Sequence, residues 1–188
     1  MRLPADLENY IFNEMGAKYE PNPRTVTINY FNTEEQWKIY LGTYFTRSYC
    51  EGYNTIKILL SNNVIRQIYK RIDPINIVDI GAGNGGYAFG IVDALLQMSS
   101  DIKINLYSIE GNQLAIDQQN KIYDAIYNEK IRLTPINSTV SILKGRFGND
   151  LNNYLDDIIN SHNINGFDLI VTSKFISEFY KKRSGLSY

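Results

Sequence analysis

The sequence predicts a doubly wound α/β fold with a mostly parallel sheet in residues 74–188, preceded by a helical cap region in residues 1–73. A short apolar run at 75–80 leads through a glycine-rich turn into an amphipathic stretch, which is the pattern of a buried strand followed by a helix. A second strand is expected at 104–109, and the short apolar run at 167–172 is typical of a parallel strand covered on both faces. A chain of 188 residues can bury one substantial core. We therefore expect the cap region to pack on the sheet.

Helical spacing of apolar residues predicts three helices in the cap region. They are expected over residues 4–16, 33–45 and 55–71. Pro4 suits the first turn of the first helix, and Thr33 with Gln36 forms a capping box at the start of the second. Residues 25–30 alternate like a short strand or an extended arm. A turn at 46–49 is expected to join the second and third helices.

Four glycines, Gly81, Gly83, Gly85 and Gly86, stand between the first strand and its helix. Glycine admits positive φ and lets backbone N–H groups approach a polar ligand, so the turn indicates a nucleotide-type site. The spacing also satisfies the dinucleotide fingerprint, in which a pyrophosphate lies at the helix N-terminus. Asp79 would repel a pyrophosphate, but it could accept hydrogen bonds from an amino-acid ammonium. A turn that only lets the helix pack on the sheet is the alternative.

Later strands extend the pattern. The second strand ends at Glu110, where an acidic residue is placed to accept both ribose hydroxyls, with a solvated glutamate as the alternative. Residues 139–143 are expected to form a third strand, and 167–172 a fourth after an amphipathic helix. With the strand order 3-2-1-4 the fourth strand lies at an edge, where so apolar a run invites association.

The segment Asp-Ile-Gly-Ala-Gly-Asn-Gly at 79–85 resembles the first motif of the class I S-adenosylmethionine-dependent methyltransferases. The resemblance implies a Rossmann-like methyltransferase fold, S-adenosyl-L-methionine as the cofactor, and methyl transfer to an unidentified acceptor, which is a small molecule, a protein or RNA. The expected cofactor contacts are Asp79, Gly81, Ala82, Gly83, Asn84, Gly85, Gly86, Glu110, Gly111, Asn112, Phe147, Ser173 and Arg47. No catalytic residue is named. A fainter resemblance over 168–179 is to a branch of the superfamily linked to small ribosomal subunits.

Phe147 and Arg47 each have an alternative role. Arg146 or Phe147 falls where many family members place an acid that meets the adenine amino group. Phe147 could stack on adenine or be an ordinary core or surface residue. Arg47 could pair with the cofactor carboxylate or be an exposed arginine. Ser173 occupies the place where methyltransferases meet the acceptor. Ser173 and Lys174 lack the Asn/Asp-Pro-Pro-Tyr signature, which makes an exocyclic-amine acceptor less favoured.

Two other functions remain open from the sequence. One is a non-catalytic methyltransferase-fold scaffold or assembly factor, because the adenine-side acid is absent or displaced. The other is an NAD(P)-dependent oxidoreductase, which Asp79 and the long spacing from Gly81 to Glu110 disfavour.

Composition limits the remaining classes. A net charge of −1 argues against a strongly electrostatic nucleic-acid binder, and Cys50 and His162 each stand alone, so neither a disulfide nor a metal site is expected. No membrane-length apolar stretch or signal peptide is present, which predicts a cytoplasmic location without membrane contact.

The family that the glycine motif resembles has a seven-stranded sheet, whereas four strands are recognisable here. We therefore expect this sequence to be the N-terminal part of a longer protein. The alternative is that another chain completes the sheet, through self-association at the exposed edge.

Overall fold

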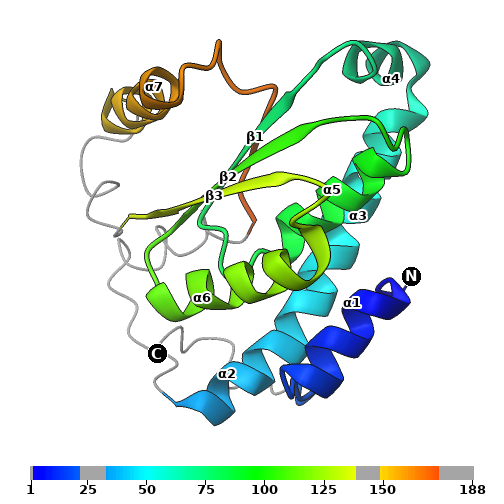
Figure 1. The fold of residues 1–188 in the computed structure, drawn as a ribbon, viewed down its shortest axis with the longest axis vertical. Helices are drawn as coiled ribbons and strands as arrows, with labels where there is room; N and C mark the ends of the chain where they lie inside the picture. The colour runs from blue at the N-terminus through cyan, green and yellow to red at the C-terminus, as the bar shows by residue number, and fades with distance from the viewer. Residues whose placement is uncertain (1, 22–32, 139–148, 174–188) are drawn as a thin grey trace, which may run out of the picture.

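The computed structural model describes residues 2–21, 33–138 and 149–173, which form a four-stranded parallel sheet with helices on both faces (Figure 1). The helices are α1 (Ala5–Asn9), α2 (Glu34–Tyr40), α3 (Thr46–Ser61), α4 (Asn63–Tyr69), α5 (Gly86–Leu96), α6 (Gln113–Ile122) and α7 (Asn149–His162), with π-helical segments η1 (Tyr10–Glu14), η2 (Leu41–Phe45) and η3 (Tyr123–Tyr127). The strands are β1 (Ile75–Ile80), β2 (Ile104–Glu110), β3 (Arg132–Asn137) and β4 (Leu169–Val171). The predicted α/β class, with a parallel sheet behind N-terminal helices, is confirmed.

The sheet has the predicted order, β3-β2-β1-β4, with parallel pairing throughout. The third strand of the described sheet is Arg132–Asn137, which the sequence did not predict, and the strand predicted at 139–143 lies outside the described residues. Pro135 pairs with Ser108 in this strand, and proline is tolerated at an edge because its missing N–H costs no ladder bond there. At the opposite edge of the described sheet, Ile170 of β4 is 55 % exposed. The prediction that this strand is covered on both faces is therefore wrong for the described part of the chain.

The two faces of the sheet bury different sets of side chains. Ile75 and Ile77 of β1 belong to a large core that also includes residues of α1, α3, α5 and α6. Val78 and Ile80 belong to a smaller core under α7. Because side chains alternate along a strand, Asp79 lies on the same face as Ile77. The cap helices and the sheet share the larger core, as expected from the sequence.

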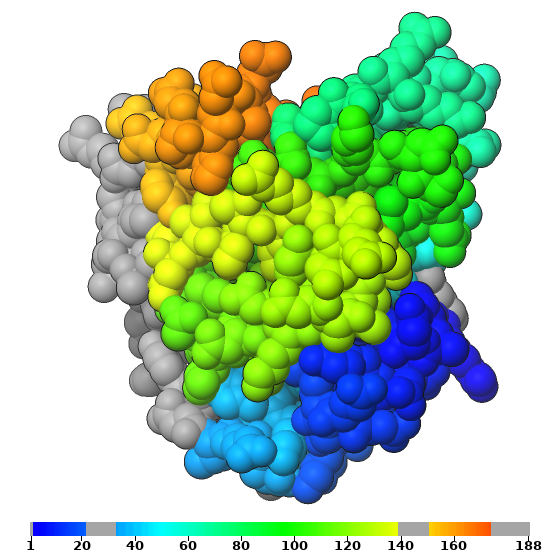
Figure 2. Space-filling view, viewed as in Figure 1, coloured from blue at the N-terminus to red at the C-terminus, as the bar shows by residue number. Residues whose placement is uncertain are grey.

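The N-terminal helix packs against the segment that leads from η3 to β3. In the space-filling view the first residues lie directly beside this segment (Figure 2), where Nζ of Lys130 is 4.0 Å from Oδ2 of Asp6. Among the described residues, none of the helices is both long enough and apolar enough to cross a bilayer.

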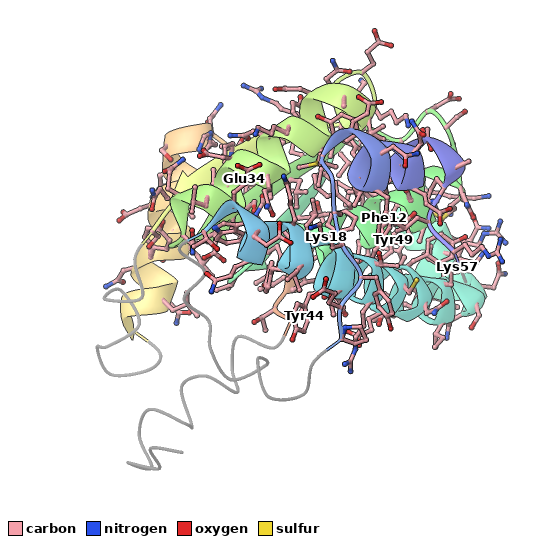
Figure 3. The ribbon with its side chains drawn as sticks, turned by 90° about the horizontal axis from the view of Figure 1, so that it is seen from below. Phe12, Lys18, Glu34, Tyr44, Tyr49 and Lys57 are labelled. Atoms are coloured by element: carbon pink, nitrogen blue, oxygen red, sulfur yellow. The ribbon has the colours of Figure 1, made fainter. Side chains whose placement is uncertain are left out.

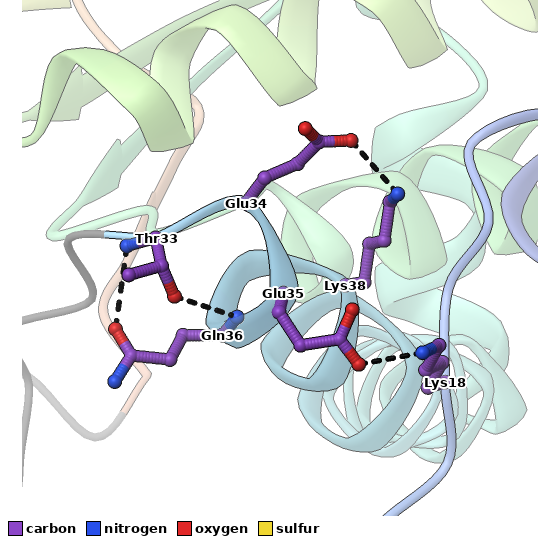
Figure 4. Close-up of polar contacts among 6 residues, drawn as sticks. All are labelled: Lys18, Thr33, Glu34, Glu35, Gln36 and Lys38. Atoms are coloured by element: carbon purple, nitrogen blue, oxygen red, sulfur yellow. Dashed lines mark hydrogen bonds and ion pairs between the residues drawn. The ribbon is translucent and has the colours of Figure 1, made fainter.

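The second helix begins at the predicted capping box. The hydroxyl oxygen of Thr33 accepts from the N–H of Gln36 at 3.3 Å, and Oε1 of Gln36 accepts from the N–H of Thr33 at 3.3 Å (Figure 4). Nζ of Lys18 lies 2.5 Å from Oε1 of Glu35, which ties the chain after η1 to the first turn of α2.

The elements α2, η2 and α3 form one continuous helix, because Leu41 and Thr46 at the two junctions have right-handed helical dihedral angles. The expected turn at 46–49 is therefore wrong, since these residues form the start of α3. The expected third helix is divided at Asn62, whose Oδ1 accepts from the N–H of Val64 at 3.0 Å and begins α4. Figure 3 shows Tyr49 of this continuous helix within the N-terminal helical layer.

The helices α3 and α5 touch backbone to backbone. A Cβ atom added at Gly52 would lie 2.1 Å from the carbonyl oxygen of Tyr87, and one added at Gly90 would lie 2.1 Å from that of Tyr49. Only glycine permits this approach, because any side chain at either position would collide with the backbone of the other helix. We call the contact formed by Gly52 and Gly90 the glycine seam.

Candidate functional site

The turn between β1 and α5 has a shape that glycine adopts with little strain. Gly81, Gly83 and Gly85 have φ angles of 72°, 58° and 82°, in the left-handed region that other residues rarely occupy. The N–H groups of Gly81 and Ala82 donate to the carbonyl oxygen of Ile109 at 2.9 and 3.1 Å. The turn is therefore attached to the carboxyl end of β2 as well as to β1.

Gly86 is a glycine for a different reason. A Cβ atom there would lie 2.7 Å from the carbonyl oxygen of Phe45, so α5 begins directly against η2. The sequence placed Gly86 among the cofactor contacts, and the structure gives it a packing role. On the same continuous helix, the hydroxyl oxygen of Tyr40 lies 3.2 Å from the position of a Cβ atom at Gly83. The cap region thus reaches the turn through Tyr40, which no sequence pattern indicated.

Gly83 is hydrogen bonded on both sides. Its N–H donates to Oε2 of Glu110 at 2.7 Å, and its carbonyl oxygen accepts from Nε2 of Gln119 at 2.5 Å. Gln119 is 1 % exposed, and its Oε1 accepts from the hydroxyl of Ser108 at 2.6 Å. Gln119 and Ser108 were missed from the sequence. Helical spacing places Gln119 on the buried face of α6, but it does not indicate which groups its amide meets.

The carboxylate of Glu110 lies beside the turn, at the end of β2. Its Oε1 accepts from the N–H of Asn112 at 2.9 Å, while Oε2 accepts from Gly83. A carboxylate oxygen can accept more than one hydrogen bond, so both oxygens keep capacity for a ligand. Asn112 also caps α6, because its Oδ1 accepts from the N–H of Leu114 at 3.0 Å, and Gly111 forms the bend between the two.

Two polar side chains of this region are buried without a hydrogen-bond partner among the described residues. Asp79 is 1 % exposed and both of its carboxylate oxygens are unpaired, and Asn84 is 3 % exposed with an unpaired Nδ2. Burial, and secondarily the charge of Glu110, raises the pKa of Asp79 to about 7. Because buried polar groups in proteins are nearly always paired, these two side chains are candidates for contact with a ligand, Asp79 as the acceptor and Asn84 as the donor.

The remaining predicted contacts are not gathered at the turn to the same degree. Nε of Arg47 lies 2.9 Å from Oε1 of Glu51 on its own helix, and the Arg47 side chain is 68 % exposed. Ser173 follows β4, the neighbour of β1, at the same carboxyl edge of the sheet as the turn. Phe147 lies outside the described residues. Within the described ranges, no group of His, Cys, Asp and Glu side chains is arranged to hold a metal ion.

A separate hollow of about 370 Å³ lies between α7 and β4. It is lined by Asn152, Leu155, Asp156, Ile159, Phe167 and Ile170. Leu155 and Phe167 belong to the smaller core, so this hollow lies on the face of the sheet opposite to Asp79. It is therefore not part of the glycine turn.

No protein-family model matches the chain, and no curated protein matches it in sequence. Among solved structures, the chain is similar to the crystal structure of a "putative RNA methyltransferase" from Pyrococcus horikoshii, at 12% sequence identity and a TM-score of 0.32, over 96% of this chain and 81% of that chain. A functional assignment therefore depends on the residues of the turn itself. The described part of this chain is an α/β protein whose parallel sheet and glycine turn have a Rossmann-like arrangement.

Proposed function

We propose that this chain binds S-adenosyl-L-methionine and transfers its methyl group to an acceptor. The observation that carries the proposal is the carboxylate of Asp79, which is fully buried and unpaired just before the glycine turn. A buried carboxylate costs several kcal/mol unless an opposite charge pairs with it. The ammonium of the cofactor's amino-acid end would supply that charge, and the unpaired amide of Asn84 would donate to the carboxylate of the same end. The donor and the acceptor left open in the turn thus match the two charges of an amino acid.

Glu110 supports the adenosine end of the proposed ligand. It lies at the carboxyl end of β2, the parallel neighbour of β1, and it is joined to the turn through the N–H of Gly83. Its oxygens can each accept a further hydrogen bond, which suits two adjacent ribose hydroxyls. Asp79 and Glu110 would therefore hold the two ends of one extended ligand at the edge of the sheet.

The same geometry disfavours a dinucleotide cofactor. A pyrophosphate needs free N–H groups at the start of the helix and no negative charge nearby. Here the N–H of Gly83 already donates to Glu110, and the charges of Asp79 and Glu110 interact with one another. An NAD(P)-dependent oxidoreductase is therefore a poorer fit to the turn than a methyltransferase.

When bound, the cofactor would supply an electrophilic methyl group on its sulfonium. The chain's own residues would contribute mainly orientation. Asp79 and Glu110 would fix the ligand's two ends, and the reacting acceptor would approach the carboxyl edge of the sheet near Ser173. Holding two reactants in line supplies a large part of the rate enhancement in such reactions. Tyr40, beside Gly83, would help to keep water from the turn.

Ligand-dependent thermal unfolding of the full chain tests the proposal, with S-adenosylhomocysteine, NAD and buffer alone compared side by side. At a concentration of 100 times its dissociation constant, a ligand that binds only the folded state adds about 2.7 kcal/mol to the free energy of unfolding. We expect S-adenosylhomocysteine to give this stabilisation and NAD to give none. Stabilisation by NAD alone would replace the proposal by an oxidoreductase, and no stabilisation by either ligand would favour a non-catalytic scaffold.

A further inference from the structure

Gln119 is a polar residue at a buried position of α6. The other buried residues of α6 are apolar, among them Ala115, Ile116 and Ile122, whereas Gln119 places an amide in the same buried layer at 1 % exposure. A buried amide is destabilising unless its hydrogen bonds are made. Both ends of this amide are used, one by Ser108 and the other by Gly83. Gln119 therefore connects β2 and α6 to the glycine turn.

The orientation of the Gln119 amide follows from its partners. A backbone carbonyl oxygen can only accept, so Nε2 must face Gly83, and Oε1 is left to accept from the hydroxyl of Ser108. Cγ of Gln119 also lies 3.0 Å from the position of a Cβ atom at Gly85. The side chain thus contacts the turn at two of its glycines.

Gly83 is the residue whose conformation this contact determines. Glu110 holds the peptide that precedes Gly83, and Gln119 holds the peptide that follows it and carries the N–H of Asn84. Glycine has many accessible conformations. If only one of its two peptides were held, Gly83 would therefore adopt φ values other than 58°. Release of the second peptide would move Asn84, and it would also weaken the hydrogen bond that orients Glu110.

We propose that Gln119, held by Ser108, is a positioning residue that fixes the Gly83 peptides and thereby aligns Glu110 and Asn84 for the two ends of the ligand. This inference rests on the proposed binding of S-adenosylmethionine. It adds a residue that touches no part of the ligand and acts through the backbone of the turn.

The test replaces Gln119 by methionine, which has a similar size and removes both hydrogen bonds. Gln118→Met, the adjacent substitution on α6, is the matched control. Calorimetry with S-adenosylhomocysteine should show an affinity about 10-fold lower for Gln119→Met and unchanged for Gln118→Met. If Gln119→Met does not fold, Ser108→Ala replaces it, with an expected loss of about 3-fold. Unchanged affinity in a folded Gln119→Met protein, or in Ser108→Ala where that variant replaces it, would overturn the inference.

A double-mutant cycle separates positioning from a general loss of stability. In the background of Glu110→Ala, the further substitution Gln119→Met should lower the affinity by clearly less than 10-fold, because part of its effect passes through Glu110. Fully additive losses would contradict the proposal.

Amide hydrogen exchange in the ligand-free protein provides a readout that does not depend on the cofactor. The N–H of Gly83 should exchange about 10-fold faster in Gln119→Met, while the amides of β1 keep their protection. Faster exchange at Gly83 together with no binding of S-adenosylhomocysteine by the wild-type chain would reject the proposed function but not the contact. Unchanged exchange at Gly83 would reject the contact itself.

Discussion

Replacement of Asp79 by asparagine removes a buried charge while nearly preserving the size of the side chain. The pKa of Asp79 is raised from 3.8 to about 7 by burial and by the charge of Glu110. A raised carboxyl pKa means that the folded state binds the proton more tightly than the unfolded state does. The contribution of Asp79 to stability is therefore greatest below pH 3.8, falls as the pH rises from 3.8 to 7, and is constant above pH 7.

The size of this effect follows from the two pKa values, since each pH unit between them corresponds to about 1.4 kcal/mol. By pH 8 the ionised Asp79 lowers the free energy of unfolding by about 4 kcal/mol, of which roughly 2 kcal/mol is already lost at pH 5. Asparagine does not titrate. Relative to the wild-type chain, Asp79→Asn should therefore gain roughly 2–3 kcal/mol between pH 5 and pH 8.

Thermal unfolding without ligand at pH 5 and pH 8 measures this difference, which for a chain of this length corresponds to roughly 5–10 °C in Tm. Asp157→Asn, at an exposed position of α7, is the matched control and should show no such gain. Calorimetry at pH 8 should show that Asp79→Asn also weakens S-adenosylhomocysteine binding. Parallel pH profiles for the wild-type and Asp79→Asn proteins would refute the buried charge, and unchanged affinity would refute its role in binding.

The remaining predictions concern the same turn and the free edge of the described sheet. Because the Asp79 carboxylate must be ionised to pair with an ammonium, the affinity of the wild-type chain for S-adenosylhomocysteine, measured by calorimetry from pH 5.5 to 8, should fall up to tenfold per pH unit below about pH 7. Gly83→Val should abolish this binding, because φ is 58° there. Gly166→Val, also at a positive φ (146°) but with no neighbour within 4 Å of an added Cβ, should leave the affinity intact. Glu110→Ala should weaken binding by roughly 10- to 150-fold in the same assay, as expected for the loss of charge-assisted bonds; a loss under 3-fold would exclude Glu110 as a ligand. If the chain self-associates through the β4 edge, Ile170→Lys should reduce the associated mass measured by light scattering. An unchanged mass distribution would place the contact elsewhere.

The unit formed by β1, the glycine turn and α5 could be predicted from the sequence because its signals are local. An apolar run, a glycine turn and an amphipathic stretch follow one another at 75–96, and β1, the turn and α5 lie there. β3 was missed because Pro135 interrupts its apolar pattern. Proline usually argues against a strand, and only the position of β3 at an edge of the described sheet removes the objection.

The supporting contacts of the site could not be predicted, because they join residues far apart in the chain. Gln119 meets Gly83, and Tyr40 comes beside the same glycine from the cap region. Periodicity reports which face of a helix is buried, but it does not report which carbonyl group a side chain on that face will meet. The expected turn at 46–49 failed for a related reason, since the π-helical η2 carries the helix through without a break.

The glycine seam has a consequence for how the protein can move. With no side chains between the backbones of α3 and α5, a swing of one helix away from the other would separate two surfaces packed at atomic contact. Tyr40 belongs to the same continuous helix as Gly52, so we expect its hydroxyl to stay beside Gly83 whether or not a ligand is bound. The cap would then act as a fixed wall instead of a hinged lid. Ligands would exchange along the carboxyl edge of the sheet, past Glu110 and Ser173, and the speed of release would be determined there.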